Sequence, residues 1–357
     1  MKKKVILTTG GTGGHIYPAL SVAQELKERD VDVIFVGSNH RMEKDLVPTH
    51  DIKFIGLNIK PPKSIKNIFT FILSIFKGIY ITYKEKPDAI IGFGNYISVP
   101  MIIGGILLRK KIYLQEQNAG LGGANKFFYP KAKKLFLAFD KTYDDIPMKY
   151  QDKLVICGNP LRKEILTINI EEEKEKLKIQ PDERVLTVTG GSLGAKAIND
   201  AMLEQWDKIF ENKKLRLYWA TGKDNYDEIS KKLSKIKIID TVKPYFNNLI
   251  NIMAASDLIL CRAGALTISE LIYLEKPSLV IPYSSKKVGQ YSNAEILSEN
   301  GSAIIYNNRE AVDAIERALA LINDNKALRK MSSKIKNLKE ENPTKKLVDN
   351  LDIWRKE

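Results

Sequence analysis

The sequence predicts an α/β protein of two Rossmann-like domains, each a doubly wound parallel sheet with helices on both faces. Three observations support this fold class. Short β-branched runs alternate with helical apolar patterns along the whole chain. The strand runs are continuously apolar, which is typical of parallel strands buried on both faces. A strand, a glycine turn and a helix follow one another from residue 5 and again from residue 185, so both halves open in the same way.

Each expected strand is a short β-branched or aromatic run, and each expected helix has apolar residues three or four positions apart. In the first half we expect strands at residues 4–9, 31–37, 89–94, 111–117 and 133–139, and helices at 17–29, 42–48 and 64–84. In the second half, residues 184–206 have the pattern of a strand, a turn and a helix. Further strands are expected at 215–222, 237–242, 257–264 and 278–283, and helices near 245–254, 265–275, 290–299, 309–322 and 325–340.

Two Asn-Pro pairs, which favour turns, mark the expected domain boundaries. The first is Asn159-Pro160, so we expect one domain over residues 1–161 and a second over 162–343. The second pair, Asn342-Pro343, precedes a last helix expected over 344–356. We expect residues 344–357 to return to the first domain.

The composition excludes several classes of protein. With 357 residues, 44% hydrophobic and 28% charged, the chain is neither disordered, collagen-like nor a small disulfide scaffold. Cys157 and Cys261 are far apart, which excludes a zinc knuckle or a redox dithiol and favours a reducing cytoplasm. The basic start has only four apolar residues before its glycines, so we expect no signal peptide, and no run reaches about 18 apolar residues.

The net charge of +14 is distributed unevenly. Residues 1–161 contain 24 Lys and Arg against 14 Asp and Glu, whereas residues 162–357 contain 33 against 29. A basic domain indicates an anionic partner, either a nucleic acid or a membrane surface.

The two glycine turns are candidate ligand sites. Backbone N–H groups at a helix start favour anions, most often phosphate. A dinucleotide fingerprint is disfavoured because Ile16 stands where its last glycine belongs and no acid closes the second strand at Ser38. Neither turn has the Gly-Lys-Ser/Thr of a P-loop. The alternative is that the glycines only let strand and helix pack closely; Thr12 and Ser192, at matching positions in the two turns, favour a ligand.

Several longer motifs identify a family. GGTGGHIYPALSVA, DLVP, LQEQNAGLGGANK, GNPLR, GGSLGAKAIN and CRAGALTISEL occur in this order over nearly the whole chain. They resemble the bacterial undecaprenyl-diphospho-muramoylpentapeptide β-N-acetylglucosaminyltransferases, the MurG family of the GT-B superfamily. The resemblance implies two Rossmann-like domains facing across a cleft. It also implies inverting transfer of N-acetylglucosamine from UDP-N-acetylglucosamine to an undecaprenyl-linked muramyl-pentapeptide, with the lipid acceptor held by the N-terminal domain.

The resemblance also implies the residues that bind UDP-N-acetylglucosamine. Glu270 is expected to accept hydrogen bonds from the ribose diol, and Phe246 marks the backbone that holds uracil. The expected set is Thr12, Gly13, Gly14, Asn118, Arg162, Ser192, Phe246, Ala265, Leu266, Thr267, Ile268, Ser269, Glu270 and Gln290. On the residues alone, Thr267 and Glu270 also fit a helix capping box. Arg262 is left out of the site as a structural charge.

Inverting transfer needs a base that removes the proton of the attacking hydroxyl. His15 lies in the first glycine turn, and an imidazole changes protonation near neutral pH, so His15 is the first candidate. Glu116 is the second candidate, as base or as orienter. The alternative for His15 is a histidine that only hydrogen-bonds the backbone at a helix start.

The sequence departs from the family pattern at two positions. Asn95 replaces a glycine in a second glycine loop, and Gly289 replaces the first glutamine of a pair that ends at Gln290. We expect no cofactor and no metal site, because the DxD-like pair Asp30 and Asp32 precedes a strand instead of closing one. Helix starts and Arg162 are expected to stabilise the departing diphosphate instead.

Residues 60–86 are expected to bind a membrane surface. They contain six lysines and one glutamate around an apolar helical stripe that is wider than one core face needs. This pattern is typical of a helix lying on an anionic bilayer. The expected contacts are Lys63, Ile65, Lys66, Phe69, Ile72, Phe76 and Lys77. The alternative is a buried helix with solvated ends.

We therefore expect a peripheral enzyme at the cytoplasmic face of the bacterial cell membrane, with no nucleic acid as partner because no nucleic-acid motif is present. Another GT-B enzyme, such as a UDP-N-acetylglucosamine 2-epimerase, is the first alternative; it would share the glycine loops but lack the basic apolar helix. A membrane-bound nucleotide sensor without catalytic activity is the second.

Overall fold

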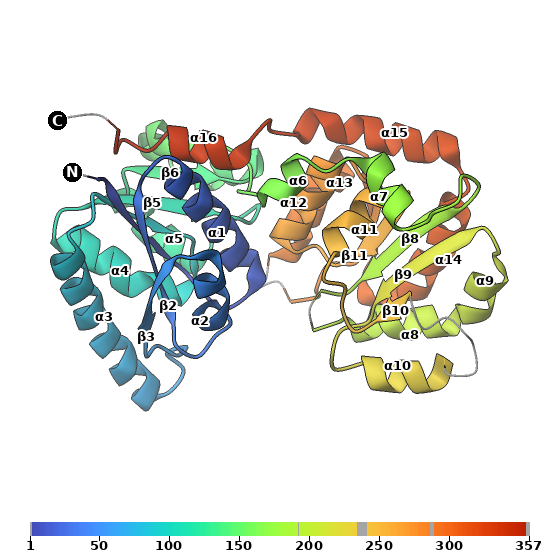
Figure 1. Ribbon diagram of the computed structural model, residues 1–357, viewed down its shortest axis with the longest axis horizontal. Helices are drawn as coiled ribbons and strands as arrows, with labels where there is room; N and C mark the ends of the chain where they lie inside the picture. The colour runs from blue at the N-terminus through green and yellow to red at the C-terminus, as the bar shows by residue number, and fades with distance from the viewer. Residues whose placement is uncertain (1, 192, 234–240, 286–288, 355–357) are drawn as a thin grey trace. The chain divides into compact units, whose positions relative to one another are not determined.

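The computed structural model describes residues 2–191, 193–233, 241–285 and 289–354. The chain divides into two compact units. The first contains Met1–Lys163 and Glu340–Glu357, and the second contains Glu164–Lys339. Each unit is an open parallel sheet between helices (Figure 1), so the predicted pair of Rossmann-like domains is confirmed.

The first unit is built on a seven-stranded sheet of order β3-β2-β1-β4-β5-β6-β7, with every pair parallel. The strands are β1 (Lys4–Thr8), β2 (Asp32–Ser38), β3 (Lys53–Leu57), β4 (Ala89–Gly92), β5 (Lys111–Glu116), β6 (Lys134–Leu137) and β7 (Leu154–Ile156). Alternate residues of each strand enter different cores because side chains alternate across a sheet. Val5 and Leu7 pack with α1 (Gly13–Glu28) and α16 (Pro343–Asp349), whereas Ile6 packs with α4 (Asn95–Leu107).

The second unit repeats this plan with a six-stranded sheet of order β10-β9-β8-β11-β12-β13, again parallel. Its strands are β8 (Arg184–Thr189), β9 (Leu215–Ala220), β10 (Val242–Lys243), β11 (Leu258–Cys261), β12 (Ser278–Val280) and β13 (Ala303–Ile305). The main helices are α8 (Lys196–Glu204), α11 (Leu249–Ala255), α12 (Ala265–Leu274), α13 (Gln290–Glu299), α14 (Ala311–Leu321) and α15 (Asn325–Ile335).

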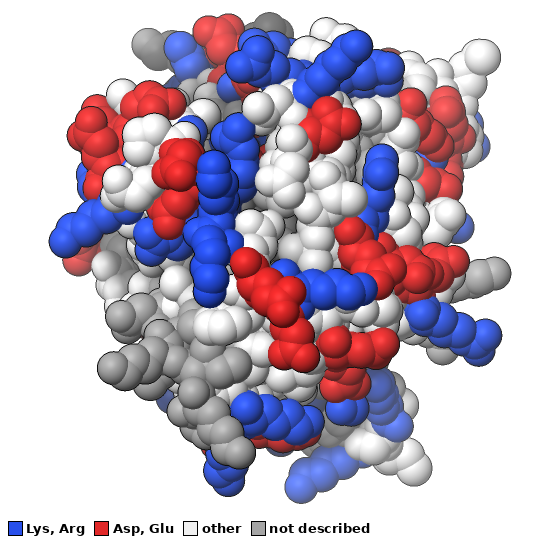
Figure 2. Space-filling view, turned by 90° about the vertical axis from the view of Figure 1, so that its right-hand side faces the viewer, with Lys and Arg blue, Asp and Glu red and all other residues white. Residues whose placement is uncertain are grey.

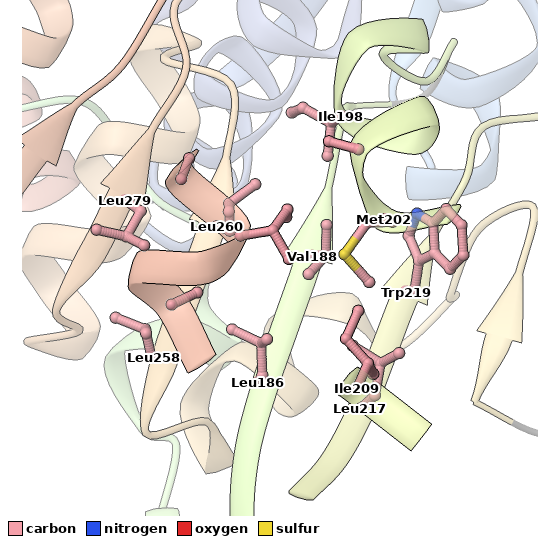
Figure 3. Close-up of a cluster of buried hydrophobic side chains, with 14 of the residues drawn as sticks. Leu186, Val188, Ile198, Met202, Ile209, Leu217, Trp219, Leu258, Leu260 and Leu279 are labelled. Atoms are coloured by element: carbon pink, nitrogen blue, oxygen red, sulfur yellow. The ribbon is translucent and has the colours of Figure 1, made fainter. Parts of the chain in front are cut away.

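One face of the second sheet is closed by a large apolar core (Figure 3). Strand residues such as Leu186, Val188 and Leu260 pack there with Ile198 and Met202 of α8. Trp219 is fully buried, and its indole N–H donates to the Asn199 side chain at 3.0 Å. The polar end of the ring is therefore satisfied inside an apolar layer.

One expectation about helices is wrong. The last helix ends at Asp349 and not near residue 356, because the chain then turns inward to bury Leu351 and Ile353 in the first core. The longest helix, α3 (Ile65–Glu85), is long and apolar enough to cross a membrane by length and composition alone, although polar residues interrupt its apolar runs. Most of the expected strand at 237–242 lies outside the described residues.

Candidate active site

The strand order of each sheet reverses once, between β1 and β4 in the first unit and between β8 and β11 in the second. Open parallel sheets bind ligands at the carboxyl ends of the strands on either side of such a reversal. Both glycine turns follow these strands, β1 and β8. Each unit therefore has one candidate site at the carboxyl edge of its sheet.

The first glycine turn is organised by a carboxylate that the sequence analysis missed. Glu43 of α2 (Glu43–Leu46) is fully buried, and it accepts hydrogen bonds from the N–H groups of Gly11 at 3.1 Å and Ser38 at 2.9 Å. A Cβ at Gly10 would lie within 2.0 Å of this carboxylate. Glycine at position 10 is therefore needed to admit Glu43, and one N–H group of the turn is already bound to an anion.

His15 lies in the first turn of α1, next to the loops that follow β4 and β5. Its Nδ1 is 3.1 Å from the carbonyl oxygen of Phe93 and 2.7 Å from Oε1 of Gln117. Gln117 is almost completely buried and also donates to the Phe93 carbonyl at 3.0 Å. The imidazole is thus held on one side by two buried oxygen atoms from two different loops.

Glu116 ends β5 and is also buried. Its Oε1 accepts from the backbone N–H and the side-chain amide of Asn118, both at 3.1 Å. Its Oε2 accepts from the N–H of Gly122 at 2.8 Å and from the Asn125 amide at 2.9 Å. Because an ionised carboxylate offers about four acceptor positions, these four N–H groups use all of them.

Asn95 has a left-handed backbone conformation, with φ of 56°, which glycine adopts readily. Its side chain donates to the Gly10 carbonyl at 2.6 Å and accepts from the N–H of Ile97 at 2.8 Å. The loop that follows β4 is therefore tied directly to the first glycine turn. The left-handed turn forms with asparagine because the side-chain hydrogen bonds stabilise a backbone conformation that most other residues avoid.

The remaining expected residues of the first unit lie at the start of α1 or contact it. Thr12 precedes α1 with extended backbone, and Gly13 and Gly14 form its first turn. The guanidinium carbon of Arg162 lies 5.0 Å from the centre of the aromatic ring of Tyr17 in α1, which is within the range of a cation–π interaction. Asn159 donates to the Gln117 carbonyl at 3.0 Å, which anchors the turn that precedes Arg162.

The second unit contains a cavity of about 610 Å³ at its strand reversal. Three of the expected donor-binding side chains, Thr267, Glu270 and Gln290, line it together with the glycines of the second turn. The helix α12 starts at Ala265 after Gly264, so Thr267 lies inside the first turn and cannot be the N-cap of a capping box. The capping alternative for Thr267 and Glu270 is therefore wrong, and the start of α12 is directed at the cavity.

Arg262 also lines this cavity, although the sequence analysis left it out. Its guanidinium donates to the carbonyl oxygen of Ile281 at 2.9 Å and to Oδ1 of Asn308 at 2.6 Å, and it lies 6.0 Å from the centre of the Tyr283 ring. Burial lowers the pKa of Arg262 from its ordinary value. Its neighbours along the chain, Cys261 and Ala263, are fully buried. A charged residue between two apolar core residues is the sequence pattern that could have identified Arg262 as a cavity residue.

The other expected residues of the second unit have various positions. Ala265 and Leu266 are half-buried in the first turn of α12, whereas Ile268 points into the core and Ser269 donates to the Ala265 carbonyl at 3.0 Å. Gln290 begins α13, and its Oε1 accepts from the Tyr283 N–H at 2.9 Å. The ring of Phe246 packs edge to face on the ring of Tyr218, with 5.9 Å between the two ring centres, and Phe246 does not line the cavity. Ser192 lies outside the described residues.

The helix α3 has most of its large apolar side chains on the outside. Ser74, Gly78, Ile81 and Thr82 form its buried face, and a Cβ at Gly78 would lie 2.4 Å from the carbonyl oxygen of Pro100 in α4. Figure 1 shows the two helices side by side. The exposed apolar face, which we call the α3 stripe, consists of Ile65, Ile68, Phe69, Ile72, Leu73, Phe76, Tyr80 and Tyr83.

All seven expected membrane contacts are exposed. Lys63 and Lys66 lie at the amino end of α3, whereas Lys77 donates to the Gly56 carbonyl at 2.8 Å and so reaches back toward β3. Within the bounds of the two units, the first contains 30 Lys and Arg against 19 Asp and Glu, and the second 27 against 24. Basic and acidic side chains are interspersed on the face of the second unit drawn in Figure 2. The basic excess therefore belongs to the unit that contains α3.

Asp30 and Asp32 form ion pairs with Lys2 at 2.7 Å and Lys4 at 3.6 Å, at the amino end of β2. This is the edge of the sheet opposite to the glycine turns. Across the part of the chain that the structure describes, no three His, Cys, Asp or Glu side chains are grouped so that they could hold a metal ion.

Two protein-family models match the chain. The glycosyltransferase family 28 N-terminal domain matches residues 5–137, and the glycosyltransferase family 28 C-terminal domain matches residues 185–350. The chain is 54% identical over 353 residues to the UDP-N-acetylglucosamine–N-acetylmuramyl-(pentapeptide) pyrophosphoryl-undecaprenol N-acetylglucosamine transferase of Fusobacterium nucleatum, covering 99% of each chain.

Among the solved structures that resemble nearly the whole chain are a MurG and an epimerase. The crystal structure of Acinetobacter baumannii MurG matches with a TM-score of 0.77 and 25% identity, covering 97% of this chain and 98% of that one. The UDP-GlcNAc 2-epimerase of Neisseria meningitidis, bound to UDP-GlcNAc, matches with a TM-score of 0.69 and 18% identity, covering 98% and 99%. The second likeness concerns the fold alone.

Proposed function

The chain belongs to glycosyltransferase family 28, and from this premise we propose that it transfers N-acetylglucosamine from UDP-N-acetylglucosamine to undecaprenyl-pyrophosphoryl-muramyl-pentapeptide. It is an N-acetylglucosaminyltransferase of peptidoglycan synthesis that converts lipid I to lipid II. The observation that carries this function is the identity of 54% with a transferase of that name over 99% of both chains. The epimerase alternative shares only the fold with this chain.

The cavity of the second unit is proposed to bind the donor. Glu270, which lines the cavity from the second turn of α12, suits the ribose diol because a carboxylate accepts two hydroxyl hydrogen bonds. The N–H groups at the start of α12 and the Arg262 guanidinium suit the diphosphate. Gln290 and Asn118 are proposed for the sugar, Phe246 for uracil, and Ser192 and Arg162 for the phosphates.

The site of the first unit is proposed to activate the acceptor, with Thr12, Gly13 and Gly14 against the substrate. The muramyl hydroxyl transfers its proton to His15 while its oxygen bonds to the anomeric carbon, and the bond from that carbon to the diphosphate breaks with its electron pair on UDP. Glu116 is a positioning residue in this proposal, because its four acceptor positions are filled by N–H groups of its own loop. His15 is the proposed catalytic base.

The α3 stripe is proposed to rest on the cytoplasmic face of the bacterial cell membrane, where the lipid acceptor lies. Three observations support this. The apolar side chains are outside, the small residues are buried against α4, and the basic excess belongs to the same unit. Because its inner face packs on α4, α3 is proposed to lie in the interface and not to cross the bilayer.

The decisive test is transfer of radiolabel from UDP-N-acetylglucosamine. We expect label in the lipid and release of UDP when the enzyme is incubated with lipid I. Glu270→Ala should raise the KM for the donor, and His15→Ala should lower kcat by about 100-fold or more, as expected for loss of a general base. An isomerised nucleotide sugar without labelled lipid would overturn the proposal in favour of an epimerase. Binding without any turnover, unaffected by His15→Ala, would favour a sensor.

A further inference from the structure

The neighbours of His15 determine which of its nitrogens carries the proton. Nδ1 faces the Phe93 carbonyl oxygen at 3.1 Å and Oε1 of Gln117 at 2.7 Å. A backbone carbonyl only accepts hydrogen bonds, so Nδ1 has to donate to it. The same holds for Gln117 if its oxygen, and not its nitrogen, faces the ring. The orientation of the Gln117 amide therefore has to be established from its own neighbours.

The buried amides behind His15 orient one another in a single direction. Asn159 donates through Nδ2 to the Gln117 carbonyl at 3.0 Å, which leaves its Oδ1 as an acceptor. Gln115 donates through Nε2 to that Oδ1 at 3.0 Å and to the Glu116 carbonyl at 3.1 Å, which leaves its Oε1 as an acceptor. Gln117 then donates through Nε2 to Oε1 of Gln115 and to the carbonyls of Phe93 and Gln115.

Every amide in this series has a backbone carbonyl at its nitrogen, so no member can be flipped without placing two acceptors together. Oε1 of Gln117 is consequently an acceptor and Nδ1 of His15 a donor. All three amide residues are buried, at 0% exposure for Gln115 and 1% for Gln117 and Asn159. A buried amide without hydrogen bonds destabilises the folded state, and the bonds of this series supply partners for the three amides.

We propose that the series Asn159–Gln115–Gln117 holds His15 in its Nδ1–H tautomer, so that Nε2 is the atom that removes the proton of the acceptor hydroxyl. This inference rests on the proposed function for the identity of the acceptor, but the tautomer itself does not. When Nε2 takes the proton, the ring becomes an imidazolium that keeps its Nδ1–H bonds to the two oxygens. The proton then leaves from Nε2 to water, and the starting tautomer is restored.

Gln117 acts here as a positioning residue, in the place that a carboxylate occupies behind the histidine of a serine protease. There, loss of the correct tautomer costs roughly 10⁴-fold in kcat. We expect a smaller loss on removal of Gln117, because the Phe93 carbonyl still accepts from Nδ1. A neutral amide also leaves the ring without an added negative charge, unlike a carboxylate.

Kinetics with a matched control test this role. Gln117→Met should lower kcat by about 10- to 100-fold, bounded by the roughly 10⁴-fold serine-protease effect, and leave the KM for UDP-N-acetylglucosamine within about twofold. In a His15→Ala background, Gln117→Met should have no further effect, since it acts through His15. Gln24→Met is the control, because Gln24 contacts His50 at 3.1 Å on the same unit and should leave kcat unchanged. Equal losses with and without His15 would overturn the proposal in favour of a structural role.

A spectroscopic measurement keeps the inference testable where a variant does not fold. ¹⁵N-histidine NMR of the wild-type enzyme distinguishes protonation at Nδ1 from protonation at Nε2. We expect His15 to be protonated at Nδ1, with its signal assigned by its loss in His15→Ala. Protonation at Nε2 would refute the inference even if the enzyme transfers label to lipid. Failure to transfer label, with Nδ1 protonated, would instead refute the proposed function.

Discussion

Glu116 and His15 are both titratable side chains in one site, but their hydrogen bonds differ in kind. Glu116 accepts four N–H bonds that close the loop between Glu116 and Asn125, whereas the imidazole ring of His15, among the described residues, is hydrogen-bonded through Nδ1. A base needs a nitrogen that can accept the proton of the substrate, and Nε2 of His15 is the atom proposed for this. The two residues are therefore proposed to have different roles, the carboxylate shaping the loop and the imidazole accepting the proton.

This distinction predicts the effect of Glu116→Gln. The new amide nitrogen would face N–H donors, so at least one buried bond is lost, which costs about 1–3 kcal/mol of stability. We expect a lower thermal midpoint and a lower kcat, but an unchanged shape of the pH profile of kcat/KM. The profile and the unfolding curve should be measured on the same preparation. Disappearance of the acidic limb, with normal stability, would instead identify Glu116 as the base.

Single residues show where sequence reasoning succeeds and where it stops. His15 was proposed because it lies in a glycine turn that follows a strand, and Glu270 and Gln290 were proposed from the family resemblance; the last two line the cavity of the second unit. Glu43, Arg262 and Gln117 were not among the expected site residues. Their importance depends on contacts between segments distant in sequence, such as Glu43 with Gly11 and Gln117 with His15, and no local pattern encodes these contacts.

At the scale of elements, α3 shows why periodicity predicts a helix better than its orientation. The apolar stripe was visible in the sequence, but whether that stripe faces the core or the solvent depends on the opposite face. Gly78 lies so close to the carbonyl of Pro100 that only glycine fits, and Thr82 donates back to the Gly78 carbonyl at 2.8 Å. The small residues, together with Ile81, therefore form the packing face, which leaves most of the large apolar side chains outside.

The two faces of α3 should respond differently to substitution. Gly78→Ala places a methyl group against the backbone of α4, and such overpacking lowers the free energy of unfolding by about 1–3 kcal/mol.

The double variant Phe69→Ser and Phe76→Ser removes side chains that are 61% and 64% exposed, so it should leave the thermal midpoint nearly unchanged. It should weaken vesicle binding by about 100-fold or more, because each phenylalanine contributes roughly 1.5–3 kcal/mol at full burial.

Sedimentation with vesicles and thermal unfolding, measured on both variants, provide the test. Phe210→Ser is the control, since Phe210 is 43% exposed and belongs to the second unit, whereas α3 belongs to the first. If the double variant binds vesicles as well as the wild type does, the α3 stripe is not the membrane contact. If it instead unfolds at a much lower temperature, the stripe belongs to a packed interface.

For the whole molecule, the net charge of +14 conceals an asymmetry between the two units. The first carries a net charge of +11 and the second +3 within the bounds of the units. The sequence predicted both the excess in the first half and an apolar helix at residues 60–86, but it left a buried helix as the alternative, and the structure shows that the apolar stripe is exposed. Charge and apolar area contribute to membrane binding in different ways, since salt screens the first and not the second.

Vesicle binding should therefore have two separable parts. Raising the ionic strength from 0.05 M to about 0.5 M should remove most of the preference for anionic over zwitterionic vesicles, because the Debye length falls from about 14 Å to about 4 Å.

The double variant Lys63→Gln and Lys66→Gln should weaken binding to anionic vesicles by roughly 10-fold or more at low salt, at about 1 kcal/mol per lysine, and have little effect at high salt. Lys77→Gln should matter less, because Lys77 is engaged with the Gly56 carbonyl. Loss of binding that is equal for both vesicle types at every salt concentration would contradict an electrostatic role for these lysines, and would leave the α3 stripe as the sole source of membrane affinity.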